Sequence, residues 1–292
     1  MRITQQSLAS RTYDNLQASL ARSARLQEQL SSGKQISRPS DGPGQTASAM
    51  QLRGSLRTTE QYVRNADDAQ AWLSTADSAL QAVSTSLQRA RDLAVQGANA
   101  GAMPLQARQA IADEVRQIRE TVLGLANTQY LGRPVFGGTT AGGSAYDAAG
   151  AYLGDTGTVS RRVGPNAQVR ADVSGVAVFG DGAGSVFDVL DTLATDLVTD
   201  PAAVQASLAA IDGALEDVLS GLSDVGSRVN RVEAMKRTNE AQVVEVRSNL
   251  SEVEDIDLPR TIMDLQLQEV AYQAALGATA RVLQPSLLDF LR

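Results

Sequence analysis

Nine apolar residues between positions 66 and 94 are separated by alternating steps of three and four residues, with no polar residue breaking the series. The series is Ala66, Ala69, Leu73, Ala76, Leu80, Val83, Leu87, Ala90 and Ala94. Steps that average 3.5 residues place these side chains in one stripe along a helix, as in the seam of a coiled coil. The window 44–103 contains no proline. We therefore predict one continuous helix over residues 44–98, roughly 80 Å long at a rise of 1.5 Å per residue.

A second proline-free window, residues 202–258, carries a similar stripe from Val225 to Val253. It follows Asp200-Pro201, a pair typical of a helix start. Lys236 and Asn239 interrupt the stripe. Polar residues in a seam either fix the register of two helices or mark a weak stretch that faces solvent, and both alternatives are open at this stage.

Shorter apolar stripes at both ends of the chain predict an assembly interface, because a narrow seam on a single helix pair leaves apolar surface for other subunits. The predicted interface residues are Leu16, Leu20, Leu26, Leu30, Ile262, Leu265, Tyr272, Leu276, Leu283, Leu287, Leu288, Phe290 and Leu291.

The middle of the chain has a different character, since thirteen of the 24 glycines fall within residues 132–184. Apolar residues two positions apart flank the turn residues Gly164-Pro165-Asn166, with Val159 and Val163 before the turn and Val169 and Val173 after it. This alternation predicts a β-hairpin.

The pattern as a whole predicts a mainly α fold, with long antiparallel coiled-coil-like helical arms formed by the N- and C-terminal regions and a small inserted β-rich domain. We expect three domains: a terminal helical domain of residues 1–40 plus 258–292, a helical rod of 41–131 plus 185–257, and the insert of 132–184.

The two ends carry opposite charge. Residues 1–40 hold six basic and two acidic side chains, a net +4, whereas residues 251–292 hold seven acidic and three basic side chains, a net −4. The two ends could attract each other, or the charges could line two solvated helix faces.

The composition excludes several chemistries, because the chain has no cysteine and no histidine. Disulfides, thiol nucleophiles, imidazole catalysis and zinc sites with sulfur or imidazole ligands are impossible. No motif predicts a catalytic, cofactor-binding or metal-binding residue. The net charge of −7 argues against a nucleic-acid partner, and no stretch approaches the ~20 apolar residues of a membrane span. The N-terminus also lacks the apolar run of a secretory signal.

Two functions from other classes are alternatives to assembly. A hydrolase would have to use the carboxylates of the insert, namely Asp147, Asp155, Asp172 and Asp181. A cytoplasmic coiled-coil scaffold would need only the helical seams.

Several motifs resemble the flagellin family of axial proteins of the bacterial flagellum. They occur in order at both ends, within about 1–137 and 222–292. They are Met1–Thr4, Leu26–Ile36, Arg38–Pro43, Gln61–Leu73, Leu87–Asn99, Val225–Glu233, Tyr272–Leu276 and Ser286–Leu291. One departure is Gly42, where the family more often has a second acid after Asp41.

The resemblance implies a non-enzymatic adaptor at the hook–filament junction, outside the cell, between a hook-associated protein 1 layer and the flagellin filament. Copies of the chain would form a ring, with the terminal helices in an inner tube. It also implies export through the flagellar type III apparatus, an export chaperone as a partner, and ends that fold on assembly. The alternative that the resemblance allows is a flagellin-type filament subunit.

Overall fold

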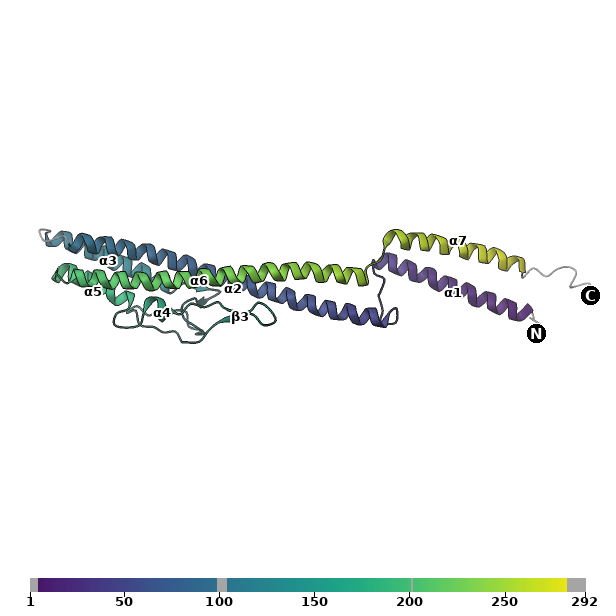
Figure 1. Ribbon diagram of the computed structural model, residues 1–292, viewed down its shortest axis with the longest axis horizontal. Coiled ribbons are helices and arrows are strands. Elements are labelled where there is room, and N and C mark those ends of the chain that lie inside the picture. Colours follow the sequence, from purple (N-terminus) through teal and green to yellow (C-terminus); the bar gives the residue numbers. More distant parts are fainter. Residues whose placement is uncertain (1–4, 99–103, 201, 283–292) are drawn as a thin grey trace, which may run out of the picture. The chain divides into compact units, whose positions relative to one another are not determined.

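The computed structural model describes residues 5–98, 104–200 and 202–282 (Figure 1). The elements, in chain order, are α1 (Gln5–Ser32), α2 (Pro43–Ala98), α3 (Leu105–Ala126), β1 (Gln129–Tyr130), β2 (Arg133–Pro134), β3 (Ser160–Arg162), β4 (Gln168–Arg170), α4 (Gly175–Phe179), α5 (Val186–Thr199), α6 (Val204–Glu254) and α7 (Leu258–Val282). The predicted mainly α fold is confirmed.

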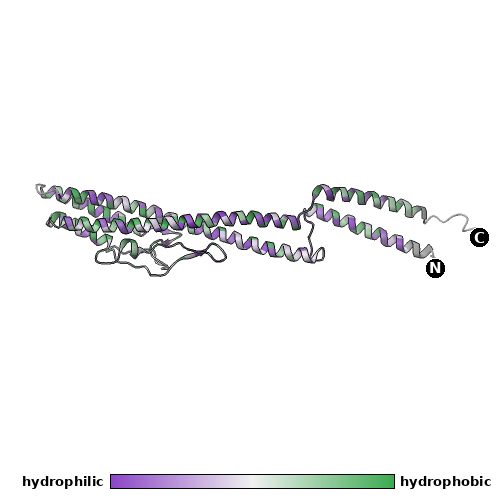
Figure 2. Ribbon diagram, in the orientation of Figure 1, coloured by the Kyte–Doolittle hydropathy of each residue, from purple (hydrophilic) through white to green (hydrophobic). Residues whose placement is uncertain are grey.

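The long helix predicted over 44–98 is α2, and all nine residues of its apolar stripe are buried. Figure 2 shows apolar and polar residues interleaved along α2 and α6, as expected of helices with one buried face. Pro43 opens α2, where its fixed φ suits a first helical position and its missing N–H leaves no helical bond unmade. Gly33 follows the last residue of α1 and has a φ of 69°. Glycine is favoured here because it adopts this left-handed conformation, which often ends a helix, without steric cost.

The chain divides into two compact units. One unit contains Met1–Thr58 and Val243–Arg292, and the other contains Thr59–Gln242, so both boundaries fall inside α2 and α6. The three domains expected from the sequence, 1–40 plus 258–292, 41–131 plus 185–257, and 132–184, stay a prediction.

The unit of Thr59–Gln242 is built on a helical bundle of α2, α3, α5 and α6, which share one apolar core. Three side-chain contacts join α2 to α6, namely Asp67–Lys236, Gln70–Glu233 and Arg91–Asp212. Their positions rise along α2 as they fall along α6, so these two helices are antiparallel. The two short sheets, both antiparallel, and α4 form a lobe against this bundle (Figure 1).

The hairpin predicted around Gly164-Pro165-Asn166 is confirmed as β3–β4, with Ser160 opposite Arg170 and Arg162 opposite Gln168. Its flanking valines are buried. Aromatic side chains fill the lobe, namely Phe136, Tyr146, Tyr152 and Phe179, and Phe187 of α5 packs against Tyr146. Burial raises the pKa of the Tyr146 hydroxyl well above its usual range.

The helix start predicted at Asp200-Pro201 is displaced, although Asp200 accepts hydrogen bonds from the Ala202 and Ala203 N–H groups in the turn that leads into α6. Asp200 instead ends α5, where its N–H donates to the Asp196 carbonyl, and α6 begins at Val204. Pro201 itself lies outside the described residues. Asp suits both a helix start and the turn after a helix, which explains the error.

Candidate assembly surface

The terminal helices α1 and α7 lie side by side and antiparallel in the unit of Met1–Thr58 and Val243–Arg292 (Figure 1). At the end of α1, the Gly33 carbonyl accepts a hydrogen bond from the Ile256 N–H just before α7. Toward the start of α1, Thr12 lines the same groove as Thr279 near the end of α7.

The seam between the two helices is half polar. On α1 the shielded positions are Thr12, Leu16, Ser19, Ser23, Leu26 and Leu30, and on α7 they are Thr261, Leu265, Gln268, Tyr272, Ala275 and Thr279. Both series follow steps of four and three residues, which is the spacing of a coiled-coil seam. The Gln268 amide donates to the Ser19 hydroxyl at 2.6 Å. Small side chains leave a groove of about 380 Å³ along this seam.

A second apolar stripe runs along the outside of α7. Met263, Leu267 and Val270 are 62%, 70% and 63% exposed, and Ala274 continues the series in steps of four, three and four. Each of these residues lies two positions beyond a seam residue, which turns it roughly 200° around the helix. Thus α7 carries two coiled-coil stripes on opposite faces, and within the described residues α1 covers one of them.

Other large apolar side chains of this unit are also exposed. Tyr13 and Leu20 lie on α1, at 63% and 50% exposure, and Leu258, Ile262 and Leu276 lie on the flank of α7. An apolar surface of this extent on two neighbouring helices is typical of a protein–protein contact.

The structure separates the predicted interface residues into three groups. Leu16, Leu26, Leu30, Leu265 and Tyr272 lie in the α1–α7 seam, whereas Leu20, Ile262 and Leu276 lie on the exposed surface. Leu283, Leu287, Leu288, Phe290 and Leu291 lie outside the described residues.

The sequence interpretation missed Met263, Leu267 and Val270. Their own spacing could have revealed them, because steps of four and three recur there with no polar interruption.

Models of two regions of bacterial flagellin match the N-terminal and C-terminal parts of the chain. The N-terminal helical region of bacterial flagellin matches residues 3–141, and the C-terminal helical region matches residues 208–291. The chain belongs to the flagellin family.

Relatives within the flagellin family include proteins of two names. A flagellin of Bacillus subtilis is 26% identical over 316 residues and covers 100% of both chains. Flagellar hook-associated protein 3 of Salmonella typhimurium is 25% identical over 94% of this chain and 95% of its own length. The crystal structure of FlgL from Bacillus cereus is 27% identical, with a TM-score of 0.62 over 69% of this chain and 99% of the other.

A buried carboxylate anchors the base of the terminal pair in this flagellin-family chain. Glu254 is 3% exposed and pairs with Lys34 at 2.8 Å and with Arg53 at 2.7 Å. Its backbone carbonyl accepts from the Gln35 N–H at 2.6 Å. Burial opposes ionisation, but the hydrogen bonds and charges of Arg53 and Lys34 outweigh it, so the pKa of Glu254 is below its ordinary value of 4.5.

Among the described residues, the opposite charges of the two ends meet in one ion pair, which lies at the base of the α1–α7 pair and not along its seam. Lys34 pairs with Glu254, and Arg38 pairs with Glu28 of its own end at 3.1 Å. Attraction between the two ends is thus confirmed at Lys34–Glu254, whereas no ion pair among the described residues joins the basic residues of α1 to the acidic residues of α7.

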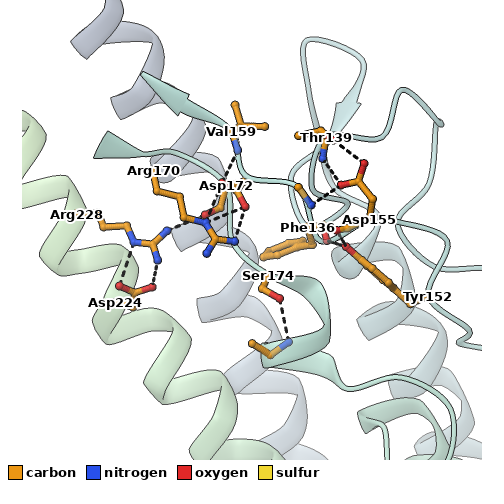
Figure 3. Close-up of polar contacts among 12 residues, drawn as sticks. Phe136, Thr139, Tyr152, Asp155, Val159, Arg170, Asp172, Ser174, Asp224 and Arg228 are labelled. Atoms are coloured by element: carbon orange, nitrogen blue, oxygen red, sulfur yellow. Dashed lines mark hydrogen bonds and ion pairs between the residues drawn. The ribbon is translucent and has the colours of Figure 1, made fainter. Parts of the chain in front are cut away.

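All four carboxylates of the lobe are engaged in holding its loops. Asp172 is fully buried, pairs with Arg170 and accepts from the Val159 N–H at 2.7 Å, while the Arg228 guanidinium donates to the Asp172 carbonyl (Figure 3). Hydrogen bonds from the Thr139 hydroxyl and N–H lower the pKa of Asp155. Asp147 and Asp181 accept backbone N–H groups. These contacts give each carboxylate a structural role and leave the hydrolase alternative without support.

Among the described residues, no cluster of acidic side chains has the arrangement of a metal site. None of the described helices combines the length and the apolar character needed to cross a bilayer.

Proposed function

We propose that this flagellin-family protein is a structural adaptor of the bacterial flagellum, which joins the hook-associated protein 1 layer to the flagellin filament through its terminal helices. The observation that carries the proposal is the second coiled-coil stripe of α7, Met263, Leu267, Val270 and Ala274, which α1 does not cover.

A helix with apolar stripes on two opposite faces needs a helix on each side. On one face of α7 the packing helix is α1 of the same chain. We infer that a terminal helix of a neighbouring subunit packs against the other face. Because the outer stripe of α7 and the surface that covers it are different surfaces, repetition of this contact produces a ring or a helical array.

The junction role is favoured over the alternative of a filament subunit by the motifs Gln61–Leu73 and Ser286–Leu291, which resemble the junction protein of this family more than flagellin. Overall identity does not separate the two, because the flagellin and hook-associated relatives are equally similar.

The proposal includes partners and a place. We infer self-association in a ring, contact with hook-associated protein 1 and flagellin, and an export chaperone that covers the terminal helices before assembly. The protein then acts outside the cell at the hook–filament junction, after export by the flagellar type III apparatus, and without enzymatic activity.

Locating the protein in purified hook–filament preparations tests this role. We expect it as a narrow band at the junction by immunogold labelling, and we expect a deletion strain to release flagellin into the medium. Labelling along the whole filament would establish the filament-subunit alternative, and absence from the flagellum would overturn both.

Leu267→Gln tests the surface itself. It removes an apolar side chain that is 70% exposed, so we expect the unfolding free energy of the monomer to change by less than about 0.5 kcal/mol, while filaments fail to attach. Leu219→Gln is the matched control, since Leu219 is a 49% exposed leucine on α6 in the other unit. Attachment by the Leu267 variant at the control level would exclude the outer stripe as the assembly surface.

A further inference from the structure

The tip of the β1–β2 hairpin exposes an apolar side chain on a strained backbone. Tyr130 pairs with Arg133, so the turn consists of Leu131 and Gly132, with φ of 49° and 77°. Two positive φ angles define a type I′ turn, whose first position favours Asn, Asp or Gly. Leu131 occupies that position and is 81% exposed.

The hairpin beneath this tip is held firmly. The Val135 N–H donates to the Thr128 carbonyl at 2.9 Å, and the Arg133 guanidinium donates to the Thr139 carbonyl at 2.9 Å. The Tyr130 ring packs against Trp72 with ring centroids 5.5 Å apart. Leu131 is therefore kept in an unfavourable conformation with little of its own chain to contact, a combination that points to a contact outside the chain.

The same unit contains a groove that an apolar side chain would fill. It lies between α5 and the start of α6 and has a volume of about 300 Å³. Its lining includes Val189, Ala203, Ala206 and Ala210, with the carboxylates of Asp188 and Asp196 alongside. Because Leu131 is mostly exposed, the groove is not filled by the tip of its own chain.

We propose that the Leu131 tip of one copy inserts into the α5–α6 groove of a neighbouring copy. Arg133, the charged residue nearest to the tip in sequence, carries the charge opposite to that of Asp188 and Asp196 of the groove. Tip and groove are different surfaces, so each copy offers one of each and the contact extends around a ring. This contact rests on the proposed ring-forming function and adds to it a second, independent interface between copies.

The absence of native cysteine allows a direct test by disulfide crosslinking. Leu131→Cys and Ala206→Cys are placed in separate full-length copies, which are co-expressed in the deletion strain and oxidised in isolated flagella. We expect at least about ten times more mixed dimer than from a control pair, because docking raises the effective concentration of the two thiols. The control pairs Leu153→Cys with Ala206→Cys, since Leu153 is a 56% exposed leucine of the same lobe.

The same pairs are also oxidised as purified protein at high concentration, so that the two proposals fail separately. Protein at the junction without the mixed dimer would overturn the tip-and-groove contact and leave the adaptor function intact. If the protein is absent from flagella, the adaptor function is contradicted. The yield of mixed dimer from the purified proteins then tests the tip-and-groove contact by itself.

Leu131→Asn removes the apolar side chain but keeps the conformation of the turn, so it distinguishes the contribution of the one from that of the other. Asn suits the left-handed position, so we expect an unchanged or higher melting temperature together with a roughly tenfold loss of attached filaments. Leu131→Met keeps an apolar tip and should restore attachment. Normal attachment by the Asn variant would contradict the contact, as would a lower melting temperature, which would show that Leu131 serves its own fold.

Discussion

Two buried carboxylates hold separate stretches of the chain together, one in each compact unit. Glu254 ties Lys34 and Arg53 to the end of α6, and Asp172 ties Arg170 to the backbone of Val159. A buried charge that loses its ionised partner costs free energy. The stability around each carboxylate therefore depends on the carboxylate being ionised.

Glu254→Gln should lower the unfolding free energy of its unit by about 1–2 kcal/mol, a modest value because the side chains of Lys34 and Arg53 are nearly half exposed. Chemical denaturation followed by circular dichroism measures this loss. Glu252→Gln is the control: Glu252 lies two residues before Glu254 on α6 and is exposed, so its replacement should change the unfolding free energy little.

The stability that Glu254 supplies should also depend on pH. Its pKa in the folded chain is below the ordinary value of 4.5, so the folded state binds this proton less tightly than the unfolded state. The contribution is complete above about pH 5 and is lost as the pH falls through the folded pKa. Wild type and Glu254→Gln should therefore converge in stability in acid, and parallel curves down to low pH would contradict this assignment.

Asp172→Asn should be more damaging, by about 2–3 kcal/mol, because the fully buried carboxylate accepts from both Arg170 and the Val159 N–H, and the amide would turn an N–H donor toward one of these donors. Urea denaturation of the full chain gives the value. Asp217→Asn, at an exposed position on α6, is the comparison, and an equal effect of the two changes would show that burial of Asp172 does not matter.

At the scale of elements, the two polar interruptions of the α6 stripe have structural partners. Asn239 is 6% exposed and donates to the Val163 carbonyl of the β3–β4 hairpin at 2.9 Å, while Lys236 pairs with Asp67 of α2 at 2.7 Å. Neither residue marks a weak stretch in solvent. Lys236 joins α6 to α2, and Asn239 joins α6 to the lobe.

Asn239→Leu should loosen the hairpin without disrupting the bundle. The Val163 carbonyl loses a buried donor, at a cost of about 1–2 kcal/mol, and amide hydrogen exchange in residues 160–170 should accelerate by roughly tenfold. Exchange in α3 should stay unchanged and serves as the internal control. Faster exchange throughout the unit would mean that Asn239 supports the whole bundle instead.

The same scale shows what the sequence could and could not predict. All nine residues predicted for the α2 stripe are buried, because the steps of three and four are unbroken by polar residues there, although other α2 residues such as Ala79, Ser84 and Leu93 are buried as well. Of the α7 seam, only Leu265 and Tyr272 are among the predicted interface residues, since apolar residues occur on both faces of α7 and polar residues occupy the seam. Hydrophobic spacing alone cannot choose between two such faces. The strained Leu131 and the buried Glu254 depend on backbone conformation and distant partners, which no sequence pattern contains.

At the scale of the whole molecule, the two units differ in how their interiors are built. The unit of Thr59–Gln242 has a large apolar core of fully buried side chains. The α1–α7 pair instead relies on partly shielded Thr, Ser and Gln side chains. Buried apolar area supplies most of the stability of a folded unit, so the two units should differ in stability.

We therefore expect amides of α1 and α7 in the free protein to exchange at least about a hundred times faster than those of residues 66–94 in α2. Hydrogen exchange with mass spectrometry on monomer and on isolated flagella measures both states. Protection of α1 and α7 should rise in flagella if neighbouring copies cover the outer stripe as proposed. Full protection in the free monomer would contradict the need for assembly.

The polar seam between α1 and α7 has a mechanical consequence. Its central contact, the hydrogen bond from Gln268 to Ser19, can be exchanged for bonds to water with little change in free energy. Pulling the two helices apart thus requires little work, and they re-form the same pairing when released. For the export and assembly proposed above, a seam that opens under small force and closes by itself would let one sequence be transported with its helices apart and then assembled with them paired.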